Sequence, residues 1–82
     1  MAVWTITIQE MARLSIERRC TCCDKPLKNT AVMLELDQRV NKYHDFQNVP
    51  GDDSQGWFPF GTTCANKARH EARVALEEKG LM

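Results

Sequence analysis

The feature that most constrains how this chain can fold is its set of four cysteines in 82 residues. Cys20, Cys22 and Cys23 lie together, and Cys64 follows in the last third of the chain. A domain of this length buries only about 60% of its unfolded surface, so its hydrophobic core alone gives marginal stability. We therefore expect the cysteines to add a staple, either as disulfides or as metal ligands.

The first residues bear on that choice through the cellular compartment. The segment from Met1 to Ile8 lacks the basic start, long apolar run and small-residue cleavage site of a secretory signal. We expect a reducing cytoplasm, which favours metal ligands over disulfides. No segment approaches the roughly 20 apolar residues of a membrane span. Eleven basic residues balance eleven acidic ones, so no overall charge attracts the chain to nucleic acid or to an anionic membrane.

The hydrophobic pattern predicts an α+β fold in a single domain, residues 1–82. Residues 3–8 alternate as a short strand would, and Thr7 and Glu10 have the spacing of a capping box that opens a helix over residues 8–16. A half-buried strand is expected over 31–37, followed by a second over 42–46. A turn at Val40-Asn41 would join them as a hairpin and place Asp37 opposite His44.

The second half of the chain predicts a loop, an extended aromatic segment and a helix. Residues 47–56 are polar and rich in Pro, Gly and Asp, and 57–60 combine three aromatic residues with a proline that only an edge strand or extended segment tolerates. A helix capped by Thr62 or Thr63 should run to about Lys79 and end at Gly80. Its inward face is a stripe of small residues, Cys64, Ala65, Ala68, Ala72, Ala75 and Leu76.

Three of the cysteines have the pattern of a structural metal site. Cys20 and Cys23 have the C-x-x-C spacing that places two thiolates on one tight turn, and Asp24 after them tolerates the turn geometry that glycine usually supplies. Cys64 stands at the start of a helix, where the helix dipole stabilises a thiolate. The expected cofactor is Zn²⁺, although buried free cysteines in a metal-free core are the alternative.

Knuckle, hairpin and a helix whose first turn gives a ligand is the order of elements in treble-clef zinc fingers, which residues 18–79 resemble. The resemblance implies a second ligand on the helix, but Lys67 occupies that position. His44 on the second hairpin strand is our first replacement, with Asp37 orienting its other ring nitrogen. Cys22 is the second, and a water, a carboxylate or a ligand from another chain completes the alternatives.

The leading functional hypothesis is a non-enzymatic, zinc-stabilised interaction module that binds another protein as a small regulator or inhibitor. Acidic side chains could steer it to a basic surface, and an aromatic residue could anchor it; the candidate partner-binding residues are Asp45, Asp52, Asp53 and Trp57. Small zinc-stapled proteins of this kind resemble those of phages and mobile elements, whose anti-defence proteins include anti-CRISPR proteins.

Two other functions compete with this hypothesis. The first is a nucleic-acid-binding zinc finger, which would use two basic groups: Arg13, Arg18, Arg19, Lys25 and Lys28, and Lys67, Arg69 and Arg73 on the last helix. The second is a degenerate HNH-type nuclease, because residues 43–45 and 64–67 resemble parts of that motif. A missing metal ligand and spare aromatic residues are also compatible with a homodimer.

Overall fold

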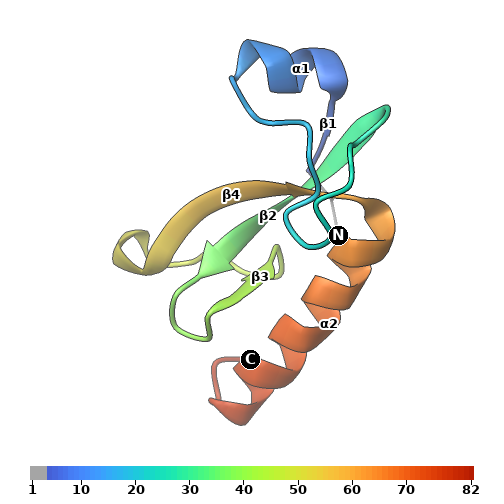
Figure 1. Cartoon of the computed structure of the whole chain (residues 1–82). Coiled ribbons are helices and arrows are strands. Elements are labelled where there is room, and N and C mark those ends of the chain that lie inside the picture. Colours follow the sequence, from blue (N-terminus) through green and yellow to red (C-terminus); the bar gives the residue numbers. More distant parts are fainter. Residues whose placement is uncertain (1–3) are drawn as a thin grey trace.

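The computed structural model describes residues 4–82, so Val3 of the expected first strand lies outside the described residues. Within them the fold is α+β, with a four-stranded antiparallel sheet and two α-helices (Figure 1). The elements in chain order are β1 (Thr5–Thr7), α1 (Ile8–Arg13), β2 (Thr30–Asp37), β3 (Lys42–His44), the 3-10 helix η1 (Gly51–Asp53), β4 (Ser54–Phe60) and α2 (Thr62–Glu78).

The strand β2 is the centre of the sheet, and every other strand pairs with it. β1 pairs antiparallel with its first residues and β3 with its last residues. β4 pairs along most of its length. Because Val32 pairs with both Thr5 and Phe60, β1 and β4 lie on opposite edges of β2. β4 is therefore an edge strand, as the proline within it predicted.

The first half of β2 is buried on both faces, whereas the sequence predicted a half-buried strand. Val32 and Leu34 face a cluster that contains Cys20, Phe60, Ala65 and Ala68, which α2 helps to form. Ala31 and Met33 face a second cluster with Ile6 and Met11 of β1 and α1. Each helix covers one face of the same strand, and two-sided burial produces a continuous apolar run rather than alternation.

The helix α1 begins as expected and ends early. The Thr7 Oγ1 accepts the backbone N–H of Glu10 at 3.2 Å, which confirms the predicted cap. The helix ends at Arg13 rather than at Ile16, because Ser15 adopts a left-handed conformation with φ 58°. The N–H of Ile16 then bonds to the carbonyl of Met11 at 2.8 Å. This stop is usually made by glycine, so a serine in its place gave no signal in the sequence.

The strand β4 begins earlier than the expected loop allowed, at Ser54, and tolerates Pro59 for a geometric reason. Pro59 pairs with Met33, whose own N–H bonds to Trp4 on the other edge of β2. The Pro59 backbone therefore points away from β2, where a missing N–H costs no sheet bond. Its carbonyl accepts both the backbone N–H and the Oγ1–H of Thr21, each at 2.9 Å.

The helix α2 matches its predicted inward stripe, with Ala65, Ala68, Ala72 and Leu76 buried. Its N-cap is Gly61 without a side-chain hydrogen bond, so neither expected threonine caps it. Gly80, with φ 71°, ends it as predicted. No helix in the described part of the chain combines the length and the apolarity that crossing a membrane requires.

The β3 end of the sheet is fastened to α2 by polar contacts. Arg69 donates to both carboxylate oxygens of Asp45 at 3.0 Å. The Arg73 guanidinium lies 4.9 Å from the centre of the Phe46 ring, a cation–π contact. The segment after β3 thereby holds the middle of α2, at Arg69 and Arg73, against the sheet.

A hydrogen-bond network around the buried Asp37 closes the hairpin of β2 and β3. The register pairs Asp37 with Lys42 and Glu35 with His44, two residues away from the expected one, because the turn spans four residues with Asn41 at φ 55°. Asp37 nevertheless contacts His44 diagonally, with Oδ2 2.8 Å from Nε2, and both residues are fully buried. The Arg39 guanidinium donates to both oxygens of the same carboxylate.

This network keeps Asp37 ionised. Burial alone would raise the pKa of Asp37, but the hydrogen bonds from Arg39 and His44 outweigh burial and lower it from 3.8 to about 2. The folded state therefore binds this proton more weakly than the unfolded state does. The resulting stabilisation, about 2 kcal/mol, is complete above the unfolded pKa and is lost as the pH falls from about 4 to about 2.

Replacing Asp37 tests this assignment. We expect Asp37→Asn to lower the free energy of unfolding at pH 7 by about 3 kcal/mol, because it leaves the partly buried Arg39 unpaired. The difference from the unmodified protein should shrink towards pH 2, as measured by urea denaturation. Asp52→Asn on the exposed loop is the control and should change stability little. An equal loss from Asp37→Asn at both pH values would contradict the assignment.

Candidate metal centre

Three cysteine thiols meet where the segment after α1 touches the start of α2. The Sγ atoms of Cys20, Cys23 and Cys64 all lie within 4.8 Å of one another, and among the described residues they form a group that could hold a metal ion. In Figure 1 the loop that carries the first two lies beside the first turn of α2. Tetrahedral zinc with Zn–S bonds of about 2.3 Å needs sulfurs about 3.8 Å apart. Small side-chain rotations would supply that contraction.

The turn that carries Cys20 and Cys23 is a knuckle closed by backbone bonds. Arg19 and Pro26 form an isolated antiparallel bridge at its base. Cys20 donates its N–H to the Lys25 carbonyl at 3.0 Å and accepts the Asp24 N–H on its own carbonyl at 2.8 Å. Asp24 takes φ 60°, the left-handed conformation that the sequence led us to expect at this position.

The surroundings of the Cys20 sulfur stabilise its thiolate form. Burial raises the pKa of this thiol, but the backbone N–H groups of Gly61, Cys23 and Cys22 point to the sulfur and outweigh burial. Together they lower the pKa of Cys20 from 9.0 to about 7. The Gly61 nitrogen lies 3.4 Å from the sulfur, so the N-cap of α2, which has no side-chain partner, directly contacts the knuckle.

Cys64, the third residue of α2, has a pKa shifted in the opposite direction to that of Cys20. Its pKa rises from 9.0 to about 12, chiefly through a hydrogen bond with Cys23 and then through burial and bonds with Cys20 and Cys22. Without a cation, the thiols compete for one negative charge, and Cys64 keeps its proton. A divalent cation would stabilise all of the thiolates at once, so the cluster has the electrostatics of a metal site.

His44 lies outside this cluster, although the sequence suggested it as the fourth ligand. Its Nε2 bonds to Asp37 at 2.8 Å, and its Nδ1 accepts the N–H of Phe46 at 3.3 Å, so both ring nitrogens are engaged. Asp37 does orient the imidazole, but it holds the ring within the hairpin. The ring is also fully buried, which places it out of reach of a nucleic-acid substrate.

The predicted partner-binding residues divide into one that is sequestered and three that are accessible. Asp45 is bound to Arg69, and its side chain is only 8% exposed. Asp52 is exposed and Asp53 is half-buried on η1. Trp57 is 41% exposed and packs edge-on against Trp4, which is itself 44% exposed, with ring centres 5.1 Å apart.

Trp4 is a functional candidate that the sequence reasoning missed. It lies two residues before the buried Ile6 and therefore on the same face, and the register places it beside Met33 on the face of the sheet that Trp57 also occupies. Its place in the alternating N-terminal segment was the only sequence signal. The pairing across β2 was not visible before the strands were arranged.

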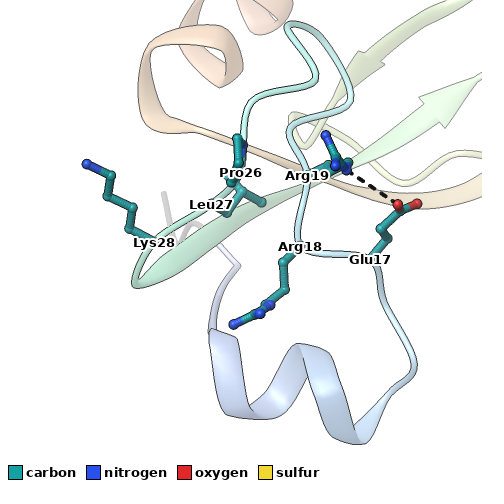
Figure 2. A pocket seen from close by; sticks show the side chains of 6 residues that line it. All are labelled: Glu17, Arg18, Arg19, Pro26, Leu27 and Lys28. Carbon is teal, nitrogen blue, oxygen red and sulfur yellow. Dashed lines mark ion pairs between the residues drawn. The ribbon is translucent and has the colours of Figure 1, made fainter.

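The basic residues are more dispersed than a nucleic-acid interface requires. A hollow of about 520 Å³ is lined by Glu17, Arg18, Arg19, Pro26, Leu27 and Lys28 and includes no cysteine (Figure 2). Figure 2 shows the charged ends of Arg18 and Lys28 well apart, while Arg19 pairs with Glu17 at 3.6 Å. Arg69 and Arg73 on α2 are committed to Asp45 and Phe46.

Comparison with known proteins gives no family for this chain. No protein-family model matches it, and no curated protein or solved structure shows significant similarity.

The left-handed residue of the knuckle can be tested directly. We expect Asp24→Ala to destabilise the protein by about 1 kcal/mol, because alanine at φ 60° meets a steric penalty that aspartate partly avoids. Asp24→Gly is the matched variant, since glycine adopts this conformation freely and should be at least as stable as the unmodified chain. Chemical denaturation of both variants gives the comparison. Equal stabilities for the alanine and glycine variants would contradict the knuckle geometry.

Proposed function

We propose that this protein is a non-enzymatic, zinc-stabilised binding module that acts on a protein partner as a small regulator or inhibitor. Cys20, Cys23 and Cys64 would hold one Zn²⁺, and the exposed Trp4–Trp57 pair would receive the partner. The observation that carries the proposal is the convergence of three thiols from two distant segments within 4.8 Å of one another. A cation there would join the knuckle to α2 and would therefore have a structural role.

The donor set and its position favour zinc. Thiolates are soft ligands that suit Zn²⁺, and structural zinc sites are built from Cys and His at knuckles and helix starts. The order of knuckle, hairpin and helix supports a treble-clef arrangement, with the difference that Lys67 on α2 is not a ligand. A small core benefits from such a staple, because metal binding adds directly to the free energy of folding.

The accessible side chains favour a protein partner with a basic surface. Exposed tryptophans are typical anchors of protein interfaces, and they bind arginine well through cation–π contacts. Trp57 pairs in register with the half-buried Glu35, and the exposed Asp52 lies on η1, which leads directly into β4. A carboxylate beside an exposed aromatic residue, as Glu35 is beside Trp57, and a second exposed carboxylate at Asp52 would complement a partner rich in arginine or lysine.

The described residues offer little for catalysis. His44, a candidate general base, is buried with both nitrogens bonded, and Asp45 is held by Arg69. A general base must reach the proton that it abstracts, so these two residues do not support the nuclease alternative. The binding function is therefore the one that the geometry favours.

Metal analysis tests the staple. We expect purified protein to contain one zinc per chain and to lose thermal stability in strong chelator, because the metal links the knuckle to α2. Cys64→Ser should lose the zinc and unfold at lower temperature, whereas Lys67→Ser, one turn further along the same helix, should keep it. Full stability in chelator, with no metal detected by elemental analysis, would overturn the zinc assignment.

Surface variants test the binding face. We expect Trp57→Ala to abolish capture of a specific partner while leaving zinc content unchanged, because Trp57 contributes no ligand to the metal site. Asp52→Asn should weaken the interaction and reduce its salt dependence. Val74→Ala, at another exposed apolar position on α2, is the control. The captured partner must bind again as a purified protein, and retention of that binding in Trp57→Ala would refute this face.

A nucleic-acid-binding zinc finger is the second candidate, and the observation that favours it is that Arg18 and Lys28 line the same hollow (Figure 2). Binding to duplex or single-stranded DNA should then fall steeply as salt rises, with a smaller slope in Lys28→Ala. Salt-independent or undetectable binding would remove this candidate.

A further inference from the structure

We propose that the free edge of β4 binds an extended segment of the protein partner as an added antiparallel strand, with an arginine of that segment beside Trp57. This inference rests on the proposed function, because it describes how the partner engages the face that contains Trp57. It assigns to the partner a backbone conformation and a side chain, both of which the proposed function leaves open.

One edge of β4 is paired with β2 and the other is open. Met33 donates its N–H to Trp4 on the far side of β2, so its partner Pro59 directs its backbone away from β2. Backbone direction alternates along a strand, so Trp57, two residues earlier, has the same outward orientation. Among residues 4–82, neither the N–H nor the carbonyl of Trp57 has a backbone hydrogen-bond partner. A strand added at this edge would supply both partners.

The chain itself occupies the neighbouring position on the same edge. The Pro59 carbonyl accepts the N–H and the Oγ1–H of Thr21, each at 2.9 Å. Thr21 therefore closes the edge on one side of Trp57. On the other side Gly56, with φ 97°, lies at a register shift, and its N–H bonds to the hydroxyl oxygen of Ser54. The open stretch is short and centred on Trp57, so it admits one short segment and resists further growth of the sheet.

A hollow of about 300 Å³ adjoins this open stretch. One wall is formed by Trp57 and Phe58 of β4, and the other by the segment after α1, including Ile16, Glu17 and Asp24. Its volume is at the lower end of the range for ligand pockets, about 300–1,000 Å³, so it suits one side chain rather than a folded element. The hollow therefore gives a side chain of the added strand a place to bind.

The charges around this hollow favour a basic side chain. The carboxylates of Glu17 and Asp24 belong to side chains that are 82% and 83% exposed, and Arg19 lies 3.6 Å from the first and 3.8 Å from the second. One guanidinium thus faces two carboxylates, which leaves negative charge in excess. The Trp57 ring adds a surface that attracts cations. Arginine fits best, because its planar group both stacks on aromatic rings and pairs with carboxylates through two hydrogen bonds.

A single residue of the added strand can meet the backbone and the hollow together. In an antiparallel pair, the residue opposite Trp57 would accept its N–H and donate to its carbonyl, and both side chains would lie on one face of the sheet. Trp57 shares this face with Glu35 and Met33, and Ile16 of the hollow packs against the cluster that contains Met33. An arginine opposite Trp57 would therefore lie on the side of the sheet where the hollow opens.

A synthetic peptide tests the added strand. The probe is a short peptide with blocked ends that places one arginine between β-branched residues, and amide hydrogen exchange of the full chain is followed by NMR. We expect the Trp57 amide to exchange about tenfold more slowly when nine-tenths of the protein is occupied, because only the free fraction exchanges. The Phe58 amide, on the side of β4 that pairs with β2, is the internal control and should be protected with and without peptide. Unchanged exchange at Trp57 on a saturable complex would overturn the proposal.

A matched peptide separates the backbone from the side chain. Methylation of the arginine backbone nitrogen keeps the guanidinium and removes the N–H that would bond to the Trp57 carbonyl. We expect this peptide to bind about tenfold more weakly, because a carbonyl loses its hydrogen bond. Equal affinity for the two peptides would show that the side chain binds without an added strand and would overturn the proposal.

Protein variants test the acidic wall of the hollow. Glu17→Gln should weaken binding of the arginine peptide about threefold and reduce its salt dependence. Glu77→Gln removes an exposed carboxylate from α2, away from the hollow, and should leave the affinity unchanged. Equal affinities for these two variants would place the arginine elsewhere and would contradict this arrangement.

The outcomes separate this inference from the proposed function. If the peptide does not protect the Trp57 amide but Trp57→Ala still loses its captured partner, the binding face stands and the added strand is refuted. If neither the peptide nor Trp57→Ala has an effect, both fail. Protection of the Trp57 amide in the protein alone, rising with its concentration, would place a second copy of the chain on this edge and would also overturn the proposal.

Discussion

The contact between the knuckle and the first turn of α2 is the constraint on which the rest of the structure depends. Gly61 donates its N–H to the Cys20 sulfur, and Thr21 donates twice to the Pro59 carbonyl just before the helix. These bonds join the segment after α1 to the end of β4. They fix where α2 begins and therefore which of its residues face the sheet. The cysteine cluster lies at this junction, so a cation bound there would strengthen the contact between the knuckle and α2.

A second constraint is the position of β2 between two helices. Its four buried apolar residues, Ala31 to Leu34, contribute to two separate apolar clusters, one beneath each helix. Farther along, the strand ends in the Asp37 network instead of in apolar side chains. A buried carboxylate is tolerated there because Arg39 supplies the opposite charge and both Arg39 and His44 supply hydrogen bonds. The sheet is thus held by apolar packing at one end and by a paired charge at the other.

The same arrangement separates structural side chains from accessible ones. Most of the candidate chemistry in the hairpin, His44 and Asp45, is directed into the fold and holds it together. The two tryptophans, which flank β2 from opposite sides on one face of the sheet, are left exposed. A domain whose titratable groups hold its own structure together and whose aromatic residues are exposed is suited to binding. We therefore propose a binding module, in which a cation held by the cysteines would act as a staple.

The sequence by itself determined the features that depend on local chemistry. The capping box at Thr7, the alanine stripe and stop of α2, the knuckle with Asp24 in a left-handed conformation, and the assembly of Cys20, Cys23 and Cys64 all follow from spacing and residue type. The tertiary structure decided what depends on neighbours distant in sequence. It set the two-sided burial of β2, the place of His44 with Asp37, the ion pair that removes Asp45 from the surface, and the meeting of Trp4 with Trp57. The physical reason is that spacing fixes which face a side chain occupies, whereas what covers that face is fixed only when separate elements pack.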